Sequence, residues 1–222
     1  MAHEGIDEMV TRFSGLGTSA VSDALDRHGI AGQALGIRPV DRGSHLLGRA
    51  YTILYQPCDV VGGTVGDYID DVPEGAVVVL DNGGRLDATV WGDILTVVAH
   101  RRRLAGTVID GVCRDSPRSL ELGYPIFSRS TYMRTGKDRV QVAGEQCPVA
   151  LGGVRVRPGD LLLGDADGIV VVPSEREEQV LAAALEIEER EEAIRQLVLR
   201  GARLDDARAQ HGYHALQSRR KG

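Results

Sequence analysis

The sequence predicts an α/β protein with a β-rich body, one strand-helix-strand unit inside that body, and a helical C-terminal extension. Three observations predict this fold class. Two apolar runs, at residues 76–80 and 106–110, flank a segment with helical periodicity; short apolar runs separated by glycine-rich turns follow; and the residues after 174 form one long amphipathic pattern. A chain of 222 residues, 42% of them hydrophobic, is long enough to bury a core.

The N-terminal third is expected to contain a helix and then strands. Apolar residues recur at helical spacing after Thr18, the expected N-cap, and Gly29 stands just past the expected end of the helix. Residues 36–75 are punctuated by glycines, and the segment RAYTILYQ alternates large residues with smaller or polar ones. This pattern predicts β-strands.

The central third forms the strand-helix-strand unit. Residues 76–80 predict a buried strand, Gly92 opens a helix, and residues 106–110 predict the next buried strand. Both strand ends carry an aspartate, Asp81 and Asp110. Ligands of such units bind at the carboxyl ends of the strands near the helix N-terminus, so we expect a functional site here.

Shorter elements follow this unit. The segment SPRSLELG predicts a short helix with Ser116 as its cap and Pro117 at its first position. Short strands are expected in VALGG, VRVRPGD and DLLLGDADGIVVVP. Within them, RPGD and GDADG are expected to form hairpin turns.

The C-terminal extension begins with residues 174–177, SERE, which match a capping box. An apolar stripe then predicts one long helix that ends at Gly201, and a shorter helix is expected near residues 204–210. We therefore divide the chain into a body, residues 1–173, and an extension, residues 174–222. Because the stripe of a helix that leaves a compact body has to be buried, we expect the extension to pack on a neighbouring subunit.

Charge and composition argue against several classes of protein. The net charge is −6 and the Lys and Arg residues are scattered, so the chain has no basic stripe for nucleic acid. No apolar run approaches the roughly 20 residues of a membrane span, and the start MAHEGIDEMVTRF lacks the order of a signal peptide. We expect a soluble, cytoplasmic protein that binds neither nucleic acid nor membranes.

The cysteines are expected to be reduced. Cys58, Cys113 and Cys147 are odd in number and show no C-x-x-C spacing, which argues against disulfides and against a thiolate zinc site. Cys113 could be an activated thiolate beside Arg114, but packing is the expected role of a free cysteine.

Three further motifs are better explained as ordinary structure. Residues 62–66, GGTVG, lack the residue order of a phosphate-binding loop. Residues 165–168, DADG, lack the remaining ligands of a calcium loop, so a hairpin turn is expected. His211 and His214 have no further metal ligands in sequence and are expected in a partly exposed tail.

The strongest candidate site combines Gly92, Asp93, Asp110, Arg114 and Asp115. The helix that starts near Asp93 presents free backbone N–H groups, which suit a carboxylate or an enolate oxygen. Arg114 can bind a carboxylate through two hydrogen bonds, and Asp115 can hold a hard cation such as Mg²⁺ together with waters. Because neighbouring side chains usually diverge, we expect Arg114 and Asp115 to have separate partners. From the residues alone, a structural salt-bridge loop is as well supported as a small-acid site.

These motifs carry a resemblance to a known family. The pattern VVVLDNGG, then WGDILTVVAHRRRLAGTVIDGVCRDS, then GDLLLGDADGIVVVP resembles the regulator of ribonuclease E activity and its aldolase relatives. Those relatives are metal-dependent 4-hydroxy-4-methyl-2-oxoglutarate / 4-carboxy-4-hydroxy-2-oxoadipate aldolases, several of which also decarboxylate oxaloacetate. The resemblance covers about residues 15–200. Its most specific element is the pair of Gly92 and Arg114, 114 − 92 = 22 positions apart as in the aldolases, and Asp115 is an acid that the regulators typically lack.

The resemblance implies a three-layer ββα sandwich of the swivelling-domain kind, assembled as a homotrimer or homohexamer. It also implies a lyase in which Asp115 holds Mg²⁺ or Mn²⁺. Arg114 and backbone N–H groups near Gly92 and Leu95 would then bind a small 2-oxo acid.

Two carboxylates complete the implied site. Asp93 and a glutamate from the long helix of a neighbouring subunit would orient waters; Glu191 is the best match, and Glu188, Glu189 and Glu192 lie close in register. Two alternatives stay open: a non-enzymatic regulator that binds a ribonuclease, and a lyase or decarboxylase acting on another 2-oxo acid.

Overall fold

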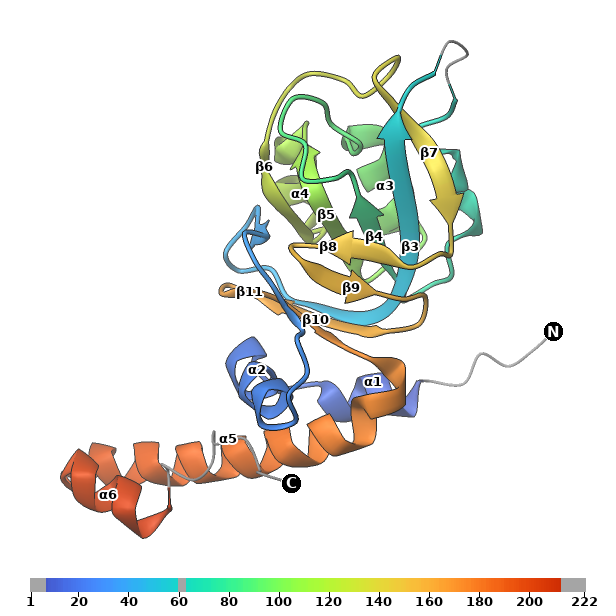
Figure 1. Cartoon of the computed structure of the whole chain (residues 1–222). Coiled ribbons are helices and arrows are strands. Elements are labelled where there is room, and N and C mark those ends of the chain that lie inside the picture. The colour runs from blue at the N-terminus through green and yellow to red at the C-terminus, as the bar shows by residue number, and fades with distance from the viewer. Residues whose placement is uncertain (1–6, 60–62, 213–222) are drawn as a thin grey trace.

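The computed structural model of the chain describes residues 7–59 and 63–212 (Figure 1). Its strands are β1 (Gln33–Ala34), β2 (Arg38–Pro39), β3 (Leu46–Pro57), β4 (Val77–Asp81), β5 (Gly106–Cys113), β6 (Ile126–Thr131), β7 (Val140–Glu145), β8 (Val149–Leu151), β9 (Val154–Val156), β10 (Leu161–Asp165) and β11 (Gly168–Val172). Its helices are α1 (Glu8–Phe13), α2 (Thr18–Arg27), α3 (Asp93–Arg101), α4 (Ser116–Leu122), α5 (Glu177–Leu199) and α6 (Leu204–Gln210), with short 3₁₀ turns η1 (Asp67–Asp71) and η2 (Ser174–Arg176). Within the described ranges, no helix combines the length and apolarity that crossing a membrane requires.

One long strand joins the two β layers. The first residues of β3 pair antiparallel with β10, whereas its central residues pair parallel with β4 and its last residues antiparallel with β7. β4, β5 and β6 continue the parallel sheet, and β11 and β1 continue the antiparallel one. The strand therefore runs from one layer into the other, as Figure 1 shows for the cyan arrow.

Helices and strands cover the parallel sheet on opposite faces. Val78 and Leu80 of β4 pack with Trp91, Ala99 and the other residues beneath α3. Val77 and Val79 of the same strand pack on the opposite face, against the β8–β9 hairpin and the strands β10 and β11. Successive side chains of β4 point to opposite faces of the sheet, so the strand contributes to two separate hydrophobic cores. The body is a three-layer ββα sandwich, as the resemblance implies.

A further helical layer covers the outer face of β10 and β11. Leu161 and Leu163 of β10 pack with α1, α2 and the first half of α5. The buried positions of α5 in this cluster are Val180, Leu181, Ala183, Ala184 and Ile187. The chain therefore buries this part of the stripe itself, and packing of the extension on a neighbouring subunit stays a prediction. On other faces and turns of α5, Leu185, Val198 and Leu199 are exposed.

Most predicted elements are confirmed. The strands expected at 76–80 and 106–110, the helix at Gly92, the long helix ending before Gly201 and the helix at 204–210 are all present. The GDADG turn joins β10 to β11 as a hairpin. Helix α1 has no counterpart among the predictions. Asp7 caps it through a hydrogen bond from the Val10 amide of 3.0 Å.

Three predicted helix starts are wrong in detail. Gly17, not Thr18, is the N-cap of α2, and Asp115, not Ser116, is the N-cap of α4, which moves Pro117 to the second helical position. The capping box at 174–177 does not form, because Glu177 is the first residue of α5 and its carboxylate binds elsewhere. The RPGD turn also differs from the prediction. It connects β9 to β10, which do not pair with each other; the hairpin turn lies between β8 and β9.

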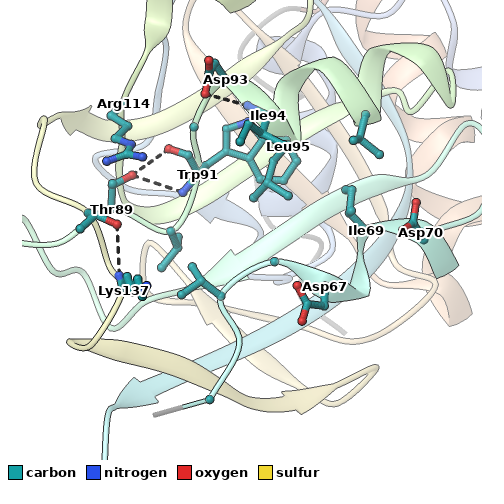
Figure 2. Close-up of a pocket in the computed structure, with 17 residues that line it drawn as sticks. Asp67, Ile69, Asp70, Thr89, Trp91, Asp93, Ile94, Leu95, Arg114 and Lys137 are labelled. Carbon is teal, nitrogen blue, oxygen red and sulfur yellow. Dashed lines mark hydrogen bonds between the residues drawn. The ribbon is translucent and has the colours of Figure 1, made fainter.

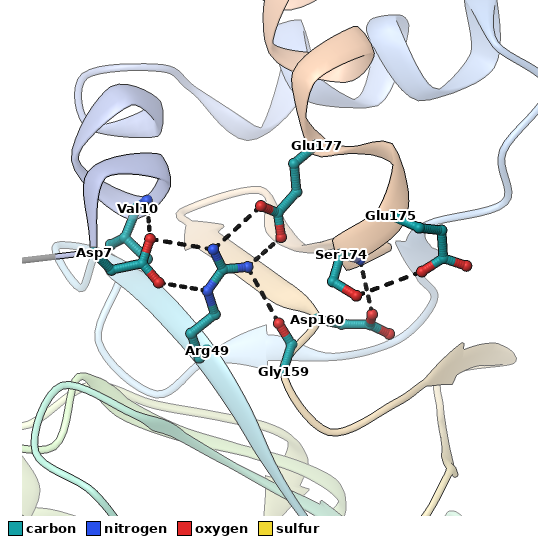
Figure 3. A network of polar contacts seen from close by, with 8 residues as sticks. All are labelled: Asp7, Val10, Arg49, Gly159, Asp160, Ser174, Glu175 and Glu177. Atoms are coloured by element: carbon teal, nitrogen blue, oxygen red, sulfur yellow. Dashed lines mark hydrogen bonds and ion pairs between the residues drawn. The ribbon is translucent and has the colours of Figure 1, made fainter.

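Arg49 of β3 joins the N-cap of α1 and the first residue of α5 to the sheet (Figure 3). Its Nε lies 2.7 Å from Asp7 Oδ2, its Nη2 lies 3.2 Å from Glu177 Oε2, and its Nη1 donates to the Gly159 carbonyl at 3.2 Å. The Glu177 side chain is only 8% exposed. Burying a carboxylate is costly unless it is paired, which explains why Glu177 binds Arg49 instead of capping its own helix.

Candidate functional site

A cavity of about 660 Å³ opens beside the N-terminus of α3 (Figure 2). Its wall combines the loop before α3, the first two turns of α3, the end of β5, the segment around η1 and the loop before β7. The cavity thus lies at the carboxyl ends of the parallel strands, where the strand-helix-strand unit predicts a site. Gly92, Asp93, Leu95 and Arg114, four of the predicted residues, line it.

Backbone and side-chain hydrogen bonds hold the loop before α3 against the end of β5. The Arg114 amide donates to the Trp91 carbonyl at 3.0 Å, and the Thr89 hydroxyl donates to the Val112 carbonyl at 3.0 Å. Trp91 is buried, donates from Nε1 to Thr96 Oγ1 at 2.9 Å and stacks on Tyr124. These contacts place the N-terminus of α3 next to Arg114.

Gly92 leaves the space that the charged pair occupies. A Cβ atom at this position would lie 2.9 Å from Asp115 Oδ2 and 3.3 Å from Arg114 Nε. Asp115 Oδ2 also accepts a hydrogen bond from the Asp93 amide at 3.4 Å. The 22-residue spacing therefore has a physical basis, because the helix N-terminus and the pair at the strand end are in contact.

Arg114 and Asp115 pair with each other, contrary to the expectation that each has a separate partner. Arg114 Nε lies 3.1 Å from Asp115 Oδ2. Asp115 has a left-handed backbone, with φ 56° and ψ 33°, which interrupts the alternation of side-chain directions that a strand imposes. The two side chains remain 37% and 41% exposed, so both groups stay accessible to a ligand.

The two strand-end aspartates have structural roles. Asp81 Oδ2 accepts from the Ala150 amide at 2.8 Å, and Asp110 Oδ2 accepts from the Gly152 amide at 2.7 Å. The other oxygen of Asp110 binds the Arg129 guanidinium. Both carboxylates are buried and hold the β8–β9 hairpin against the sheet. Asp110 is therefore not part of the cavity.

Lys137 is a cavity residue that sequence reasoning missed. It lines the cavity on the same side as Arg114 (Figure 2). It comes from the loop between β6 and β7, more than 20 positions after Arg114. Its only signal in the sequence is rarity, because Lys137 and Lys221 are the sole lysines.

Glu191 does not line the cavity of its own chain. It lies on α5, beneath the body in Figure 1, and its Oε2 is 3.5 Å from Arg195 Nη1. Burial raises the pKa of the Glu191 carboxyl, and the nearby negative charges of Asp23 and Glu188 act in the same direction. Glu188 and Glu192 also pair with Arg195.

The weaker motifs have structural explanations. Cys113 is fully buried, and burial raises the pKa of its thiol, which confirms a packing role. All three cysteines are free. His211 is the C-cap of α6, whereas Gly62 and His214 lie outside the described residues.

The donor set suits a hard cation held by one protein ligand. Among the described residues, no cluster of three or more His, Cys, Asp or Glu side chains is arranged to hold a metal. Asp115 accepts through Oδ2, and no described group hydrogen-bonds to its Oδ1. A single accessible carboxylate oxygen with waters is a common way to hold Mg²⁺.

The sequence is similar to those of known proteins. The sequence model of the RraA-like family, described as Aldolase/RraA, matches residues 18–171. The chain is 34% identical over 177 residues to a protein of Halalkalibacterium halodurans named "Putative 4-hydroxy-4-methyl-2-oxoglutarate aldolase", covering 80% of this chain and 82% of that protein. It is 40% identical over 199 residues to Protein DlpA of Legionella pneumophila, covering 88% of this chain but only 32% of DlpA. The chain thus spans about a third of that relative's length.

Solved structures share the fold. A protein from Pseudomonas syringae pv. tomato superposes with a TM-score of 0.86 at 39% identity, covering 91% of this chain and 98% of that one. Streptomyces coelicolor RraAS2, described as an unusual member of the RNase ES inhibitor RraA protein family, superposes with a TM-score of 0.77 at 29% identity, covering 86% and 98%. With the matched residues spanning both the sandwich and the cavity, the chain belongs to the RraA-like family.

Proposed function

We propose that the chain is a divalent-metal-dependent lyase that releases pyruvate from 4-hydroxy-2-oxo acids. The candidate substrates are 4-hydroxy-4-methyl-2-oxoglutarate and 4-carboxy-4-hydroxy-2-oxoadipate, with oxaloacetate decarboxylation as a second reaction. The observation that carries the proposal is the contact between the Arg114–Asp115 pair and the N-terminus of α3, beside a cavity. The name of the Halalkalibacterium relative supports the same reaction class.

A bound Mg²⁺ or Mn²⁺, with Asp115 as its protein ligand, would supply Lewis-acid stabilisation of negative charge on the keto oxygen. In the aldol reaction the C3–C4 bond breaks, its electron pair goes to the pyruvyl fragment, and the C4 hydroxyl proton leaves. Arg114 provides a fixed positive charge where the negative charge develops. Its 3.1 Å contact with Asp115 keeps the guanidinium at the cavity edge before substrate arrives.

The first turn of α3 binds the substrate carboxylate. The N–H groups in this turn have no acceptor within the helix, so they suit an anion. Two of them already have acceptors, because the Asp93 amide donates to Asp115 and the Ile94 amide donates to Asp93 Oδ1 at 2.8 Å. The Leu95 amide and the Gly92 backbone remain for the ligand, as the resemblance implies.

Water accepts and delivers the proton. Histidine is absent from the cavity wall formed by described residues, and Asp93 stands at its edge. Asp93 and Glu191 of a neighbouring subunit would orient the water that takes the hydroxyl proton. Because Lys137 lines the cavity, a Schiff base is now a chemical alternative, but Lys137 is exposed, whereas Schiff-base lysines are typically desolvated.

Turnover by matched variants tests the proposal. Pyruvate release is measured with Mg²⁺ and with chelator, for the unmodified protein, Asp115→Asn and Arg114→Ala. We expect chelator and Asp115→Asn to abolish turnover, and Arg114→Ala to cost on the order of 3 kcal/mol in transition-state stabilisation, by analogy with the loss of one oxyanion donor. Asp138→Asn is the control, because Asp138 is also an exposed aspartate with positive φ but does not line the cavity. If turnover resisted chelator and borohydride trapped the substrate on Lys137, the metal-dependent mechanism would be wrong and a Schiff-base mechanism would take its place.

A second function, inhibition of a ribonuclease by binding, is supported by the name of the Streptomyces relative. It predicts no metal-dependent turnover and a stable complex with the ribonuclease. Asp115 favours the enzyme, because the resemblance assigns a different residue to this position in the regulators. The turnover assay therefore also separates these two functions.

We further propose that the active form is a homotrimer or homohexamer. Ile94 and Val97 of α3 and Leu120 of α4 are 75%, 46% and 52% exposed, on helices that pack together beside the cavity. Apolar side chains gathered in this way favour a subunit contact. Such a contact would allow α5 of a neighbour to bring Glu191 to the site, which its own chain does not do.

A further inference from the structure

Two cationic residues line one side of the cavity, beside Asp93, and two further acidic residues line another side. Arg114 and Lys137 lie on one side in Figure 2, and Asp67 and Asp70 of η1 lie toward the other. Both pairs line the same cavity. A substrate bound at Arg114 therefore has Lys137 on the same side of the cavity and two negative charges on another side.

The acidic side is held in place by packing. A Cβ atom on Gly66 would lie 2.9 Å from Leu95 Cδ2, so the absence of a side chain lets the start of η1 approach α3 closely. Ile69 is buried and also lines the cavity, which anchors the turn between the two aspartates. Asp67 and Asp70 are exposed, and no described side chain forms an ion pair with either of them. Both aspartates therefore present negative charge to the cavity.

The wall between the two charged ends is apolar. Val65, Ile69, Leu95 and Val98 contribute to it. At about 660 Å³, the cavity falls within the roughly 300–1,000 Å³ range of sites that hold drug-sized ligands, so a six-carbon acid leaves part of it free. In the free part, the apolar wall can contact an uncharged group, and Asp67 and Asp70 repel an anion.

We propose that the cavity selects 4-hydroxy-2-oxo acids whose second substituent at C4 is uncharged, and disfavours those that carry a further carboxylate there. This inference rests on the proposed function and identifies the substrate class of the same site. Both candidate substrates have a carboxylate on C4, which Lys137 can meet. They differ at one group, which is methyl in 4-hydroxy-4-methyl-2-oxoglutarate and carboxymethyl in 4-carboxy-4-hydroxy-2-oxoadipate. The carboxymethyl group would place a third negative charge toward Asp67 and Asp70.

The test compares kcat/KM for the two acids under identical Mg²⁺ and salt. We expect a preference of about tenfold for the methyl acid, the size of effect that like charges a few ångströms apart produce near a protein surface. Raising the salt should reduce the preference, because exposed charges are screened. In the double variant Asp67→Asn with Asp70→Asn, the ratio of kcat/KM for the methyl acid to that for the carboxymethyl acid should fall from about tenfold toward one. Asp71→Asn is the control, because Asp71 lies on the same turn, is exposed and does not line the cavity.

Binding measurements separate this inference from the proposed reaction. The 4-deoxy analogues of the two acids lack the hydroxyl that cleavage requires, so their affinities are measured by calorimetry without turnover. Tighter binding of the methyl analogue, lost in the double variant, supports the inference even if neither acid is cleaved, in which case only the proposed reaction fails. Equal affinity and equal kcat/KM, or a preference for the carboxymethyl compounds, would overturn it while leaving the lyase activity standing.

Discussion

Gly92 shows how a single missing side chain organises the candidate site. It is the N-cap of α3, and the space where its Cβ would stand is occupied by Asp115 and Arg114. Its φ of −147° is an ordinary extended value, so backbone freedom does not explain the glycine. The explanation is room for the charged pair.

Gly92→Ala should therefore reduce activity without removing any functional group. The new Cβ would displace the Asp115 carboxylate and the Arg114 guanidinium, and we expect kcat/KM to fall by at least about tenfold, because misplacement of about 1 Å can cost a hundredfold. Stability should change by only about 1 kcal/mol, since the displaced atoms are side-chain ends and alanine is a somewhat poorer N-cap. Thermal unfolding and pyruvate release measure the two effects.

Gly17→Ala is the matched control. Gly17 is likewise an N-cap glycine, but a Cβ there would lie 3.9 Å from its nearest neighbour, Asp165 Oδ2. The Gly17→Ala variant should lose about as much stability as Gly92→Ala and keep full activity. Equal activity losses in the two variants would show that helix capping, and not space for Arg114 and Asp115, is the role of Gly92.

At the scale of elements, the hairpin between β10 and β11 caps a helix that is distant in sequence. Asp165 Oδ2 accepts from the Thr18 amide at 2.9 Å, and its Oδ1 accepts from the Thr18 hydroxyl at 2.8 Å. The motif that superficially matches a calcium loop thus supplies the capping group that Gly17 lacks. The Asp165 side chain thereby joins α2 to the sheet.

Asp165→Ala should destabilise the fold by about 1 kcal/mol, the usual cost of losing a helix cap. Burial alone would raise the pKa of the Asp165 carboxyl, but hydrogen bonds from Thr18 and Asp167 outweigh it, so this pKa lies below its ordinary value of 3.8. A lowered pKa means that the stabilisation is present above the unfolded-state value and is lost as the pH falls through the folded-state value. Urea unfolding at pH 7 and pH 3 should therefore show a smaller difference between the two proteins at pH 3. A difference that grows on acidification would contradict this role.

Arg49 connects elements from three parts of the chain. It binds the N-cap of α1, the first residue of α5 and the loop before β10. Asp7 is stabilised in its charged form, because the hydrogen bond from Arg49 lowers the pKa of its carboxyl. This network ties the first residue of α5 to β3 and to the loop before β10.

At the scale of the whole molecule, Glu191 and the cavity are separate within one chain. Figure 1 shows α5 running beneath the body and away from α3, and the cavity lies at the N-terminus of α3. If a neighbour supplies Glu191, each active site depends on two subunits.

Complementation tests this dependence. Asp115→Asn and Glu191→Gln are each expected to be inactive, but co-expressed chains should recover activity, because some sites combine an intact Asp115 with an intact Glu191. Random mixing of equal amounts gives about a quarter of the sites both residues, and hence about a quarter of the unmodified activity. Mixtures as inactive as the separate variants would place all catalytic groups within one chain. Asp115→Asn mixed with Arg114→Ala is the control, because both of these changes affect one chain's contribution and cannot complement.

The sequence determined what depends on local pattern. Hydrophobic periodicity identified α3 and α5, and the apolar runs identified β4 and β5. Because a parallel strand followed by a helix brings its carboxyl end to the helix N-terminus, Gly92 and Arg114 could be placed together from the amino-acid pattern alone.

The tertiary structure decided what depends on contacts between distant segments. The partner of Glu177, the cap of α2 and the hairpin support under Asp81 and Asp110 all come from residues more than 40 positions away. Lys137 and the acidic turn at Asp67 reach the cavity because the β6–β7 loop and η1 converge with the N-terminus of α3. Local propensity carries no information about such convergence, since the free energy that fixes it comes from burying side chains and pairing charges across the whole fold.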